Sequence, residues 1–176
     1  MKLNKYLSFD ISLHNTLFQL NKEYPYTHPS YITLLNTLES NWISKGYSST
    51  SEERTFKSTA YTTMNLYYMN PLDKGSDIVL LNKFINISET SQFRCCRIDK
   101  LHFLNSNELE LIDYKSGMYI PPPIDSFYTQ KSLLTVTSIK NKFGVYPDIY
   151  SFYYLRRGIK KSIHLDSDYI FILNKL

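Results

Sequence analysis

The chain has 176 residues, which is enough for one domain with a sizeable core, and we expect residues 1–176 to form a single domain. It carries 20 Lys and Arg residues against 16 Asp and Glu residues, a mildly basic balance that is compatible with a polyanionic partner. No apolar run reaches the ~18 residues of a membrane span, so we expect no membrane partner. The first ten residues have neither the apolar core of a signal peptide nor the arginines of a transit peptide.

The two cysteines, Cys95 and Cys96, are neighbours in the sequence and would face opposite sides of a strand. They cannot form a disulfide framework and offer no CxxC spacing, so we expect a reducing compartment and no iron–sulfur cluster. Tyr, Asn, Ile, Lys and Phe are abundant, and Ala60 is the sole alanine. This bias indicates an AT-rich genome, which fits either a plastid stroma or a bacterial cytoplasm.

Three helices are predicted before residue 70. Apolar side chains recur at helical spacing in residues 10–23, 30–44 and 50–69. Pro29 and Gly46 bracket the second of these helices, and a capping box that begins at Thr50 opens the third. His14 lies on the apolar stripe of the first helix, where it is either a buried core histidine or a ligand.

A strand at residues 77–87 and a β-hairpin at residues 92–115 follow. Alternation places Asp99 on the apolar side of the first arm of the hairpin, and Asp113 and Lys115 on the apolar side of the second. The turn at residues 105–107 predicts a pairing that is symmetric about its centre and sets Asp99 opposite Asp113. Directly opposed residues have Cβ atoms about 4.5–5.5 Å apart, a spacing that suits joint binding of a cation.

The opposed carboxylates predict a cation between them, because like charges in direct opposition are destabilising. A hard cation such as Mg²⁺ takes oxygen ligands and keeps positions for water and phosphate, and Lys115 could orient that water or stabilise charge on phosphorus. The alternative is an internal ion pair of Lys115 with Asp113 or Asp99 that has purely structural value.

The remaining chain predicts a helix and further strands after a proline-rich loop at residues 121–123. The helix begins at Asp125 or Ser126, runs to about residue 142 and is ended by Gly144. Gln130 lies on its core side, as either a structural hydrogen-bonding group or a functional one. Strands are expected at residues 149–155, 160–165 and 169–173. This order predicts an α/β domain with a mixed sheet flanked by helices.

The run Ile-Asp-Tyr-Lys-Ser-Gly at residues 112–117, preceded by Arg97-Ile98-Asp99, resembles motifs of the PD-(D/E)XK nuclease superfamily, specifically its RecB-like branch. Three further segments are similar to the family in the same order along the chain: residues 8–17, whose counterpart carries a metal-binding histidine, residues 42–47, and residues 154–158. The resemblance therefore covers most of the chain. It implies a restriction-endonuclease-like core with extra N-terminal helices.

By this resemblance, the chain would be a Mg²⁺- or Mn²⁺-dependent nuclease that hydrolyses DNA at ends or in single strands, in repair or recombination. His14, Asp99, Asp113 and the backbone carbonyl of Tyr114 would bind the metal. The catalytic residues would be Asp99, Asp113, Lys115 and Gln130, with Lys115 activating water and Gln130 contacting the substrate or the lysine. Because the chain has no motor motif, a helicase is a possible partner.

An outer basic set completes the expected site: Arg156, Arg157, Lys160 and Lys161. These residues could bind DNA phosphates, or they could form an ordinary solvated turn. The main alternative function is a catalytically inactive module with the nuclease fold that binds nucleic acid or serves in assembly. Cys96 and Leu134 keep this alternative open, because the family has glycine and tyrosine at the matching positions.

Overall fold

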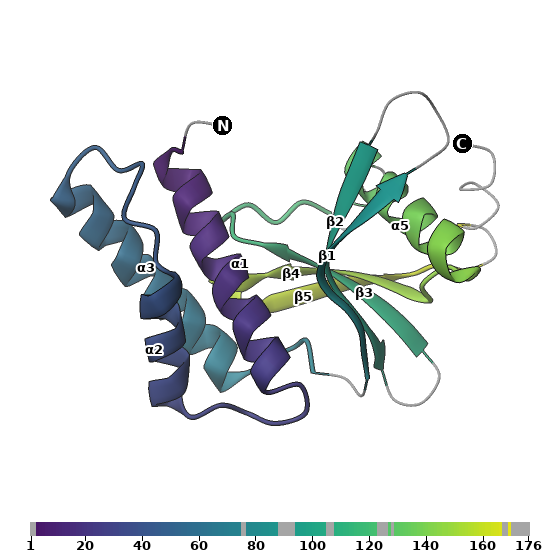
Figure 1. Ribbon diagram of the computed structural model, residues 1–176, viewed down its shortest axis with the longest axis horizontal. Coiled ribbons are helices and arrows are strands. Elements are labelled where there is room, and N and C mark those ends of the chain that lie inside the picture. The colour runs from purple at the N-terminus through teal and green to yellow at the C-terminus, as the bar shows by residue number, and fades with distance from the viewer. Residues whose placement is uncertain are drawn as a thin grey trace. The chain divides into compact units, whose positions relative to one another are not determined.

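The computed structural model describes residues 3–74, 77–87, 94–104, 108–122, 127, 129–166 and 169, and of residues 86, 87, 94, 95 and 130 it gives the backbone alone. The elements are α1 (Lys5–Glu23), α2 (Tyr31–Asn41), α3 (Thr50–Met69), β1 (Ile78–Ile87), β2 (Arg94–Leu104), β3 (Glu108–Lys115), α5 (Gln130–Phe143), β4 (Ile149–Tyr154), the 3₁₀ turn η1 (Leu155–Arg157) and β5 (Ile159–His164) (Figure 1). The α/β class with a mixed sheet and flanking helices, expected from the sequence, is confirmed.

The chain divides into two compact units. The first comprises residues 1–74, 114–118 and 154–159, and the second comprises residues 75–113, 119–153 and 160–176. Whether residues 1–176 fold as one domain stays a prediction. Within the part of the chain that the structure describes, no helix is long and apolar enough to cross a membrane.

Helices α1, α2 and α3 pack against one another in the first unit (Figure 1). Their contacts are made by fully buried apolar side chains, among them Leu13, Leu17, Leu34, Leu38 and Met64. Burial of this apolar surface, rather than helix propensity alone, is what holds short helices together in water.

Side-chain caps set where these helices begin. Helix α3 has the predicted bounds, but its cap lies one residue before the predicted Thr50: the Ser49 hydroxyl accepts the N–H of Glu52 at 3.1 Å. Helix α1 begins at Lys5, five residues before the predicted start, because the Asn4 side chain accepts the N–H of Leu7 at 3.0 Å. The predicted start followed apolar spacing alone, which does not detect a polar capping residue such as Asn4.

The sheet has the strand order β1-β2-β3-β4-β5, and the pairs β1–β2 and β2–β3 are antiparallel. The N–H of Asp148, just before β4, donates to the carbonyl of Leu109 near the start of β3 at 2.9 Å, so these two strands start at the same end of the sheet. The N–H of Leu165, just after β5, donates to the carbonyl of Asp148 at 2.8 Å, which sets β5 antiparallel to β4. The sheet is therefore mixed, with α5 as the crossover between parallel neighbours.

The register of the hairpin is the predicted one. Lys100 pairs with Ile112 and His102 with Glu110, which is symmetric about position 106. The observed pairs end at Lys100 and Ile112, one position before Asp99 and Asp113, so the direct opposition of these two aspartates stays a prediction. Strand pleating then places both carboxylates on one face of the sheet.

Helix α5 packs on β1 and β2 in the second unit. Thr129 caps its start, and Gly144, in the left-handed conformation at φ 76°, ends it as predicted. The expected cap at residue 125 or 126 lies outside the described residues, and so does the strand expected at 169–173 apart from Tyr169.

Candidate active site

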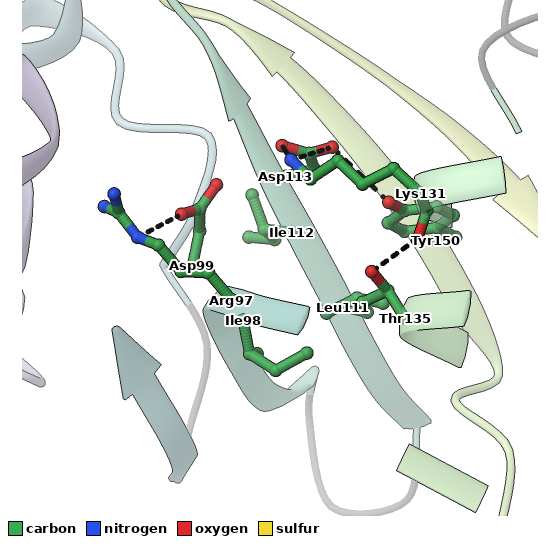
Figure 2. A pocket seen from close by; sticks show the side chains of 9 residues that line it. All are labelled: Arg97, Ile98, Asp99, Leu111, Ile112, Asp113, Lys131, Thr135 and Tyr150. Atoms are coloured by element: carbon green, nitrogen blue, oxygen red, sulfur yellow. Dashed lines mark hydrogen bonds and ion pairs between the residues drawn. The ribbon is translucent and has the colours of Figure 1, made fainter. Parts of the chain in front are cut away.

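Asp99 and Asp113 line one pocket in the second unit (Figure 2). Both aspartates are buried, with 8% and 5% of their surface exposed. The pocket is small and is lined by Arg97, Ile98, Asp99, Leu111, Ile112, Asp113, Lys131, Thr135 and Tyr150. Two buried carboxylates facing one small cavity need positive charge or hydrogen-bond donors, because an unpaired charge away from water is costly.

Two cationic side chains supply that positive charge. Arg97 Nε lies 3.3 Å from Asp99 Oδ1. Lys131 Nζ, which reaches across from α5 in Figure 2, lies 3.2 and 3.3 Å from the two oxygens of Asp113. The Lys131 side chain is 57% exposed, whereas that of Asp113 is only 6% exposed. Arg97 and Lys131 therefore balance the formal charges of the two aspartates.

Tyr150 of β4 is a neutral polar group of the pocket. Its hydroxyl lies 3.4 Å from Asp113 Oδ2 and 3.2 Å from Ser132 Oγ. Burial, and after it the charge of Asp113, raises the pKa of Tyr150 well above its usual value. The hydroxyl therefore stays protonated at neutral pH and remains a hydrogen-bond donor.

Sequence reasoning missed Arg97, Lys131 and Tyr150 as residues of this pocket. It chose Gln130, which begins α5 but whose side chain lies outside the described set, so its role stays a prediction. The neighbouring Lys131 contacts Asp113. The available signal for Lys131 was its spacing of four from Thr135, which places both side chains on one face of the helix.

His14 lies against Tyr114, near the end of β3, in the first unit. It is 7% exposed, and its ring meets the ring of Tyr114 edge to face, with centroids 6.0 Å apart. Its Nε2 lies 3.4 Å from Asp10 Oδ1, and Ser116 Oγ donates to the same Asp10 oxygen at 2.6 Å. The structure thus brings His14 next to the residue whose carbonyl was the expected fourth ligand.

The complete metal-binding set stays a prediction. His14 and Tyr114 belong to the first unit, and Asp99 and Asp113 belong to the second. Across the ranges that the structure describes, no three His, Cys, Asp or Glu side chains are grouped so that they could hold a metal ion. Lys115, the last residue of β3, is half-buried and follows Asp113 on the same side of the strand.

The outer basic set is not uniform. Arg156 has its guanidinium carbon 5.6 Å from the centre of the Phe9 ring, whereas Arg157 is exposed. Lys160 Nζ lies 2.9 and 3.2 Å from the oxygens of Glu110, so it already neutralises a buried carboxylate. A role of this set in DNA binding stays a prediction.

The opposite face of the hairpin carries a second buried polar group. Glu110 is 0% exposed and accepts from Lys160 and from the Ser151 hydroxyl. His102, 1% exposed, has Nε2 at 2.8 Å from Glu110 Oε2. The alternation of apolar and polar residues in the second arm of the hairpin predicts a polar, solvent-facing side that carries Glu110. The structure instead buries this part of the sheet on both sides.

The donor chemistry of the pocket fits a hard divalent cation. Asp99 and Asp113 offer carboxylate oxygens, which Mg²⁺ and Mn²⁺ prefer, but a metal ion there would have to replace Arg97 and Lys131 as their counter-charges. Cys96, the cysteine whose side chain is described, is a buried free thiol.

No protein-family model matches the chain, and no curated protein matches it.

Proposed function

We propose that the chain is a nuclease of the RecB-like type that uses Mg²⁺ or Mn²⁺ to hydrolyse phosphodiester bonds in DNA. The observation that carries the proposal is the pair of buried carboxylates, Asp99 and Asp113, on opposed strands beside one pocket. The resemblance of residues 112–117 to the family motif supports the same chemistry. DNA ends or single strands are the substrates that the resemblance favours.

Asp99 and Asp113 would hold the metal ion, with His14 and the carbonyl of Tyr114 as the further ligands that the resemblance implies. The ion would lower the pKa of a water molecule and neutralise charge on the phosphate. Lys115 would orient that water or stabilise the charge that develops on phosphorus, as a fixed cation does in a site that excludes water.

The pocket residues that the sequence did not indicate, Arg97, Lys131 and Tyr150, also have roles in this proposal. Once a divalent cation balances the aspartates, Arg97 and Lys131 are the cations left to bind the oxygens of an anionic phosphate. Tyr150 would serve as a neutral donor to Asp113 and hold this carboxylate in one orientation. Gln130 keeps its proposed contact with the substrate or with Lys115.

The setting of the activity is part of the proposal. Repair or recombination would fit a nuclease of this type, in a plastid stroma or a bacterial cytoplasm. A helicase would be the natural partner, since the sequence has no motor motif of its own.

A second candidate, an inactive nuclease-fold module that binds nucleic acid, is favoured by one observation. Arg97 and Lys131 form ion pairs with Asp99 and Asp113. Such pairs can be purely structural, because a buried charge that has lost its partner destabilises a fold.

Cleavage of labelled single- and double-stranded DNA tests the proposal. Wild type, Asp113→Ala and Lys115→Ala are compared in Mg²⁺, in Mn²⁺ and in EDTA. We expect metal-dependent cleavage by the wild type and its loss in both variants. Cleavage that persists in both variants would overturn the site assignment. Binding of DNA without cleavage in either metal would favour the inactive module.

A further inference from the structure

A buried carboxylate, Asp73, lies beside the end of β3 in the first unit, where the run at residues 112–117 that resembles the nuclease motif is located. It is 0% exposed and comes from the turn that follows α3. The hydroxyl of Tyr114 donates to Asp73 Oδ2 at 2.5 Å, the hydroxyl of Tyr67 at 3.3 Å, and the side-chain amide of Asn21 at 3.3 Å. A single carboxylate oxygen therefore joins α1, α3 and the end of β3.

Burying this charge is costly, and the arrangement limits the cost. Hydrogen bonds to a charged group are shorter and stronger than neutral ones, and at least three donors converge on Asp73. An apolar side chain of similar size would often stabilise such a core equally well. A carboxylate here is therefore better explained by the geometry that it imposes than by stability.

The shortest of these three hydrogen bonds comes from Tyr114, the residue next to Lys115. Tyr114, 4% exposed, directly precedes Lys115 in β3, and alternation sends their side chains to opposite faces of the strand. A tether on the Tyr114 side chain thus fixes the backbone from which Lys115 projects. Ser116, on the other side of Lys115, is held by its hydrogen bond to Asp10.

We infer that Asp73 is a positioning residue, which fixes the direction of Lys115 by hydrogen bonding to the Tyr114 hydroxyl. This inference rests on the proposed function, in which Lys115 acts at the phosphate. Residues that orient a catalytic group in this way typically change activity by about 10–100-fold when they are removed. The effect falls on the catalytic step, because the tether does not contact substrate.

Two matched variants separate positioning from stability. Tyr114→Phe and Tyr67→Phe each remove one buried hydroxyl that donates to the same oxygen of Asp73, but only Tyr114 lies in the motif strand. Asp73→Asn is the third variant. The measurements are urea unfolding, kcat and KM for DNA cleavage at saturating Mg²⁺, and deuterium uptake of the peptide that spans residues 108–118.

We expect similar unfolding curves for the two tyrosine variants. In Tyr114→Phe, kcat should fall about tenfold or more with KM unchanged, whereas Tyr67→Phe should stay within about twofold of wild type. Asp73→Asn should follow Tyr114→Phe if it folds. Equal losses of kcat in the two tyrosine variants, or no loss in either, overturn the inference.

Deuterium uptake tests the hydrogen bond between Asp73 and Tyr114 independently of the proposed nuclease activity. Failure of the wild type to cleave DNA in any metal would refute the proposed function. Faster exchange of residues 108–118 in Tyr114→Phe than in Tyr67→Phe would still establish that Asp73 holds the end of β3. Equal exchange in both variants would refute the tether, whatever the cleavage assay shows.

Discussion

Lys131 Nζ lies 3.2 and 3.3 Å from the two carboxylate oxygens of Asp113, so a lysine from the first turn of α5 neutralises the second aspartate of the hairpin. The two partners differ in exposure, because the lysine side chain is 57% exposed and the aspartate side chain 6%. A buried carboxylate with a solvent-accessible counter-charge can exchange that partner for another cation without rebuilding the core.

Replacing Lys131 should make the chain more dependent on divalent metal. Lys131→Ala leaves the charge of Asp113 without its ammonium, which we expect to destabilise the metal-free chain by about 1–2 kcal/mol, between the values for exposed and buried pairs. Thermal unfolding with and without Mn²⁺ is the measurement. The rise in Tm on adding Mn²⁺ should be larger in Lys131→Ala than in wild type.

The control for that experiment is Lys140→Ala on the same helix, since Lys140 Nζ donates to the carbonyl of Gly144 and not to an aspartate. Its response to Mn²⁺ should equal that of wild type. An identical response in Lys131→Ala and Lys140→Ala would contradict the view that Lys131 and the metal share Asp113.

Stability should fall in acid because of Glu110. Burial acts to raise the pKa of Glu110, but hydrogen bonds from His102, Ser151 and Lys160 outweigh it and set the pKa below the usual 4.5. A carboxyl group whose folded pKa is lowered stabilises the fold above its unfolded pKa, and this stability is lost as the pH falls through the folded value. The wild-type unfolding free energy should therefore drop from about pH 4.5 downward.

Glu110→Gln tests the assignment of that acid sensitivity. At pH 7 the variant should be less stable than wild type by about 1–3 kcal/mol, the cost of losing hydrogen bonds to a buried charged group. Its urea-unfolding free energy should then change less than that of wild type between pH 5 and pH 3. Parallel curves for the two proteins would show that other carboxylates govern acid unfolding.

The outer basic residues should divide into two classes. Arg157→Ala should flatten the salt dependence of binding to single-stranded DNA by about 0.7 in log–log slope, the value for one released counterion. Lys160→Ala should instead lower stability, because Lys160 neutralises Glu110. Fluorescence anisotropy in EDTA, which prevents metal-dependent cleavage, measures the slope, and Lys57→Ala on α3 is the control.

An unchanged slope in Arg157→Ala would remove this arginine from the proposed DNA contact. Loss of affinity by the same factor at every salt concentration would indicate an indirect effect on the fold.

The hairpin register could be predicted because it depends on local information. The symmetric turn and the alternation of apolar residues fix which side chains oppose one another, and the observed pairs Leu101–Leu111 and Phe103–Leu109 follow that pattern. His14 was likewise placed on the buried side of its helix by spacing alone. Both inferences needed only the period of one element.

The features of the site that could not be predicted depend on contacts between elements that are distant in sequence. Lys160 pairs with Glu110 across 50 positions, and Asp73 meets Tyr114 across 41. Burial of the second hairpin face follows from such partners, and a strand's own sequence does not reveal what covers it. Lys131 likewise meets Asp113 of β3, 18 positions away in the sequence, and the pattern of its own helix does not reveal this partner.

Calorimetric titration with Mn²⁺ measures whether Asp99 and Asp113 jointly hold a divalent cation for phosphodiester hydrolysis. We expect one site per chain in the wild type and its loss in both Asp99→Asn and Asp113→Asn. Glu108, an exposed carboxylate at the start of β3, provides the matched control, because Glu108→Gln should bind Mn²⁺ as wild type does. Equal binding of Mn²⁺ by wild type and Asp113→Asn, or no binding by the wild type, would refute a metal site at these two aspartates.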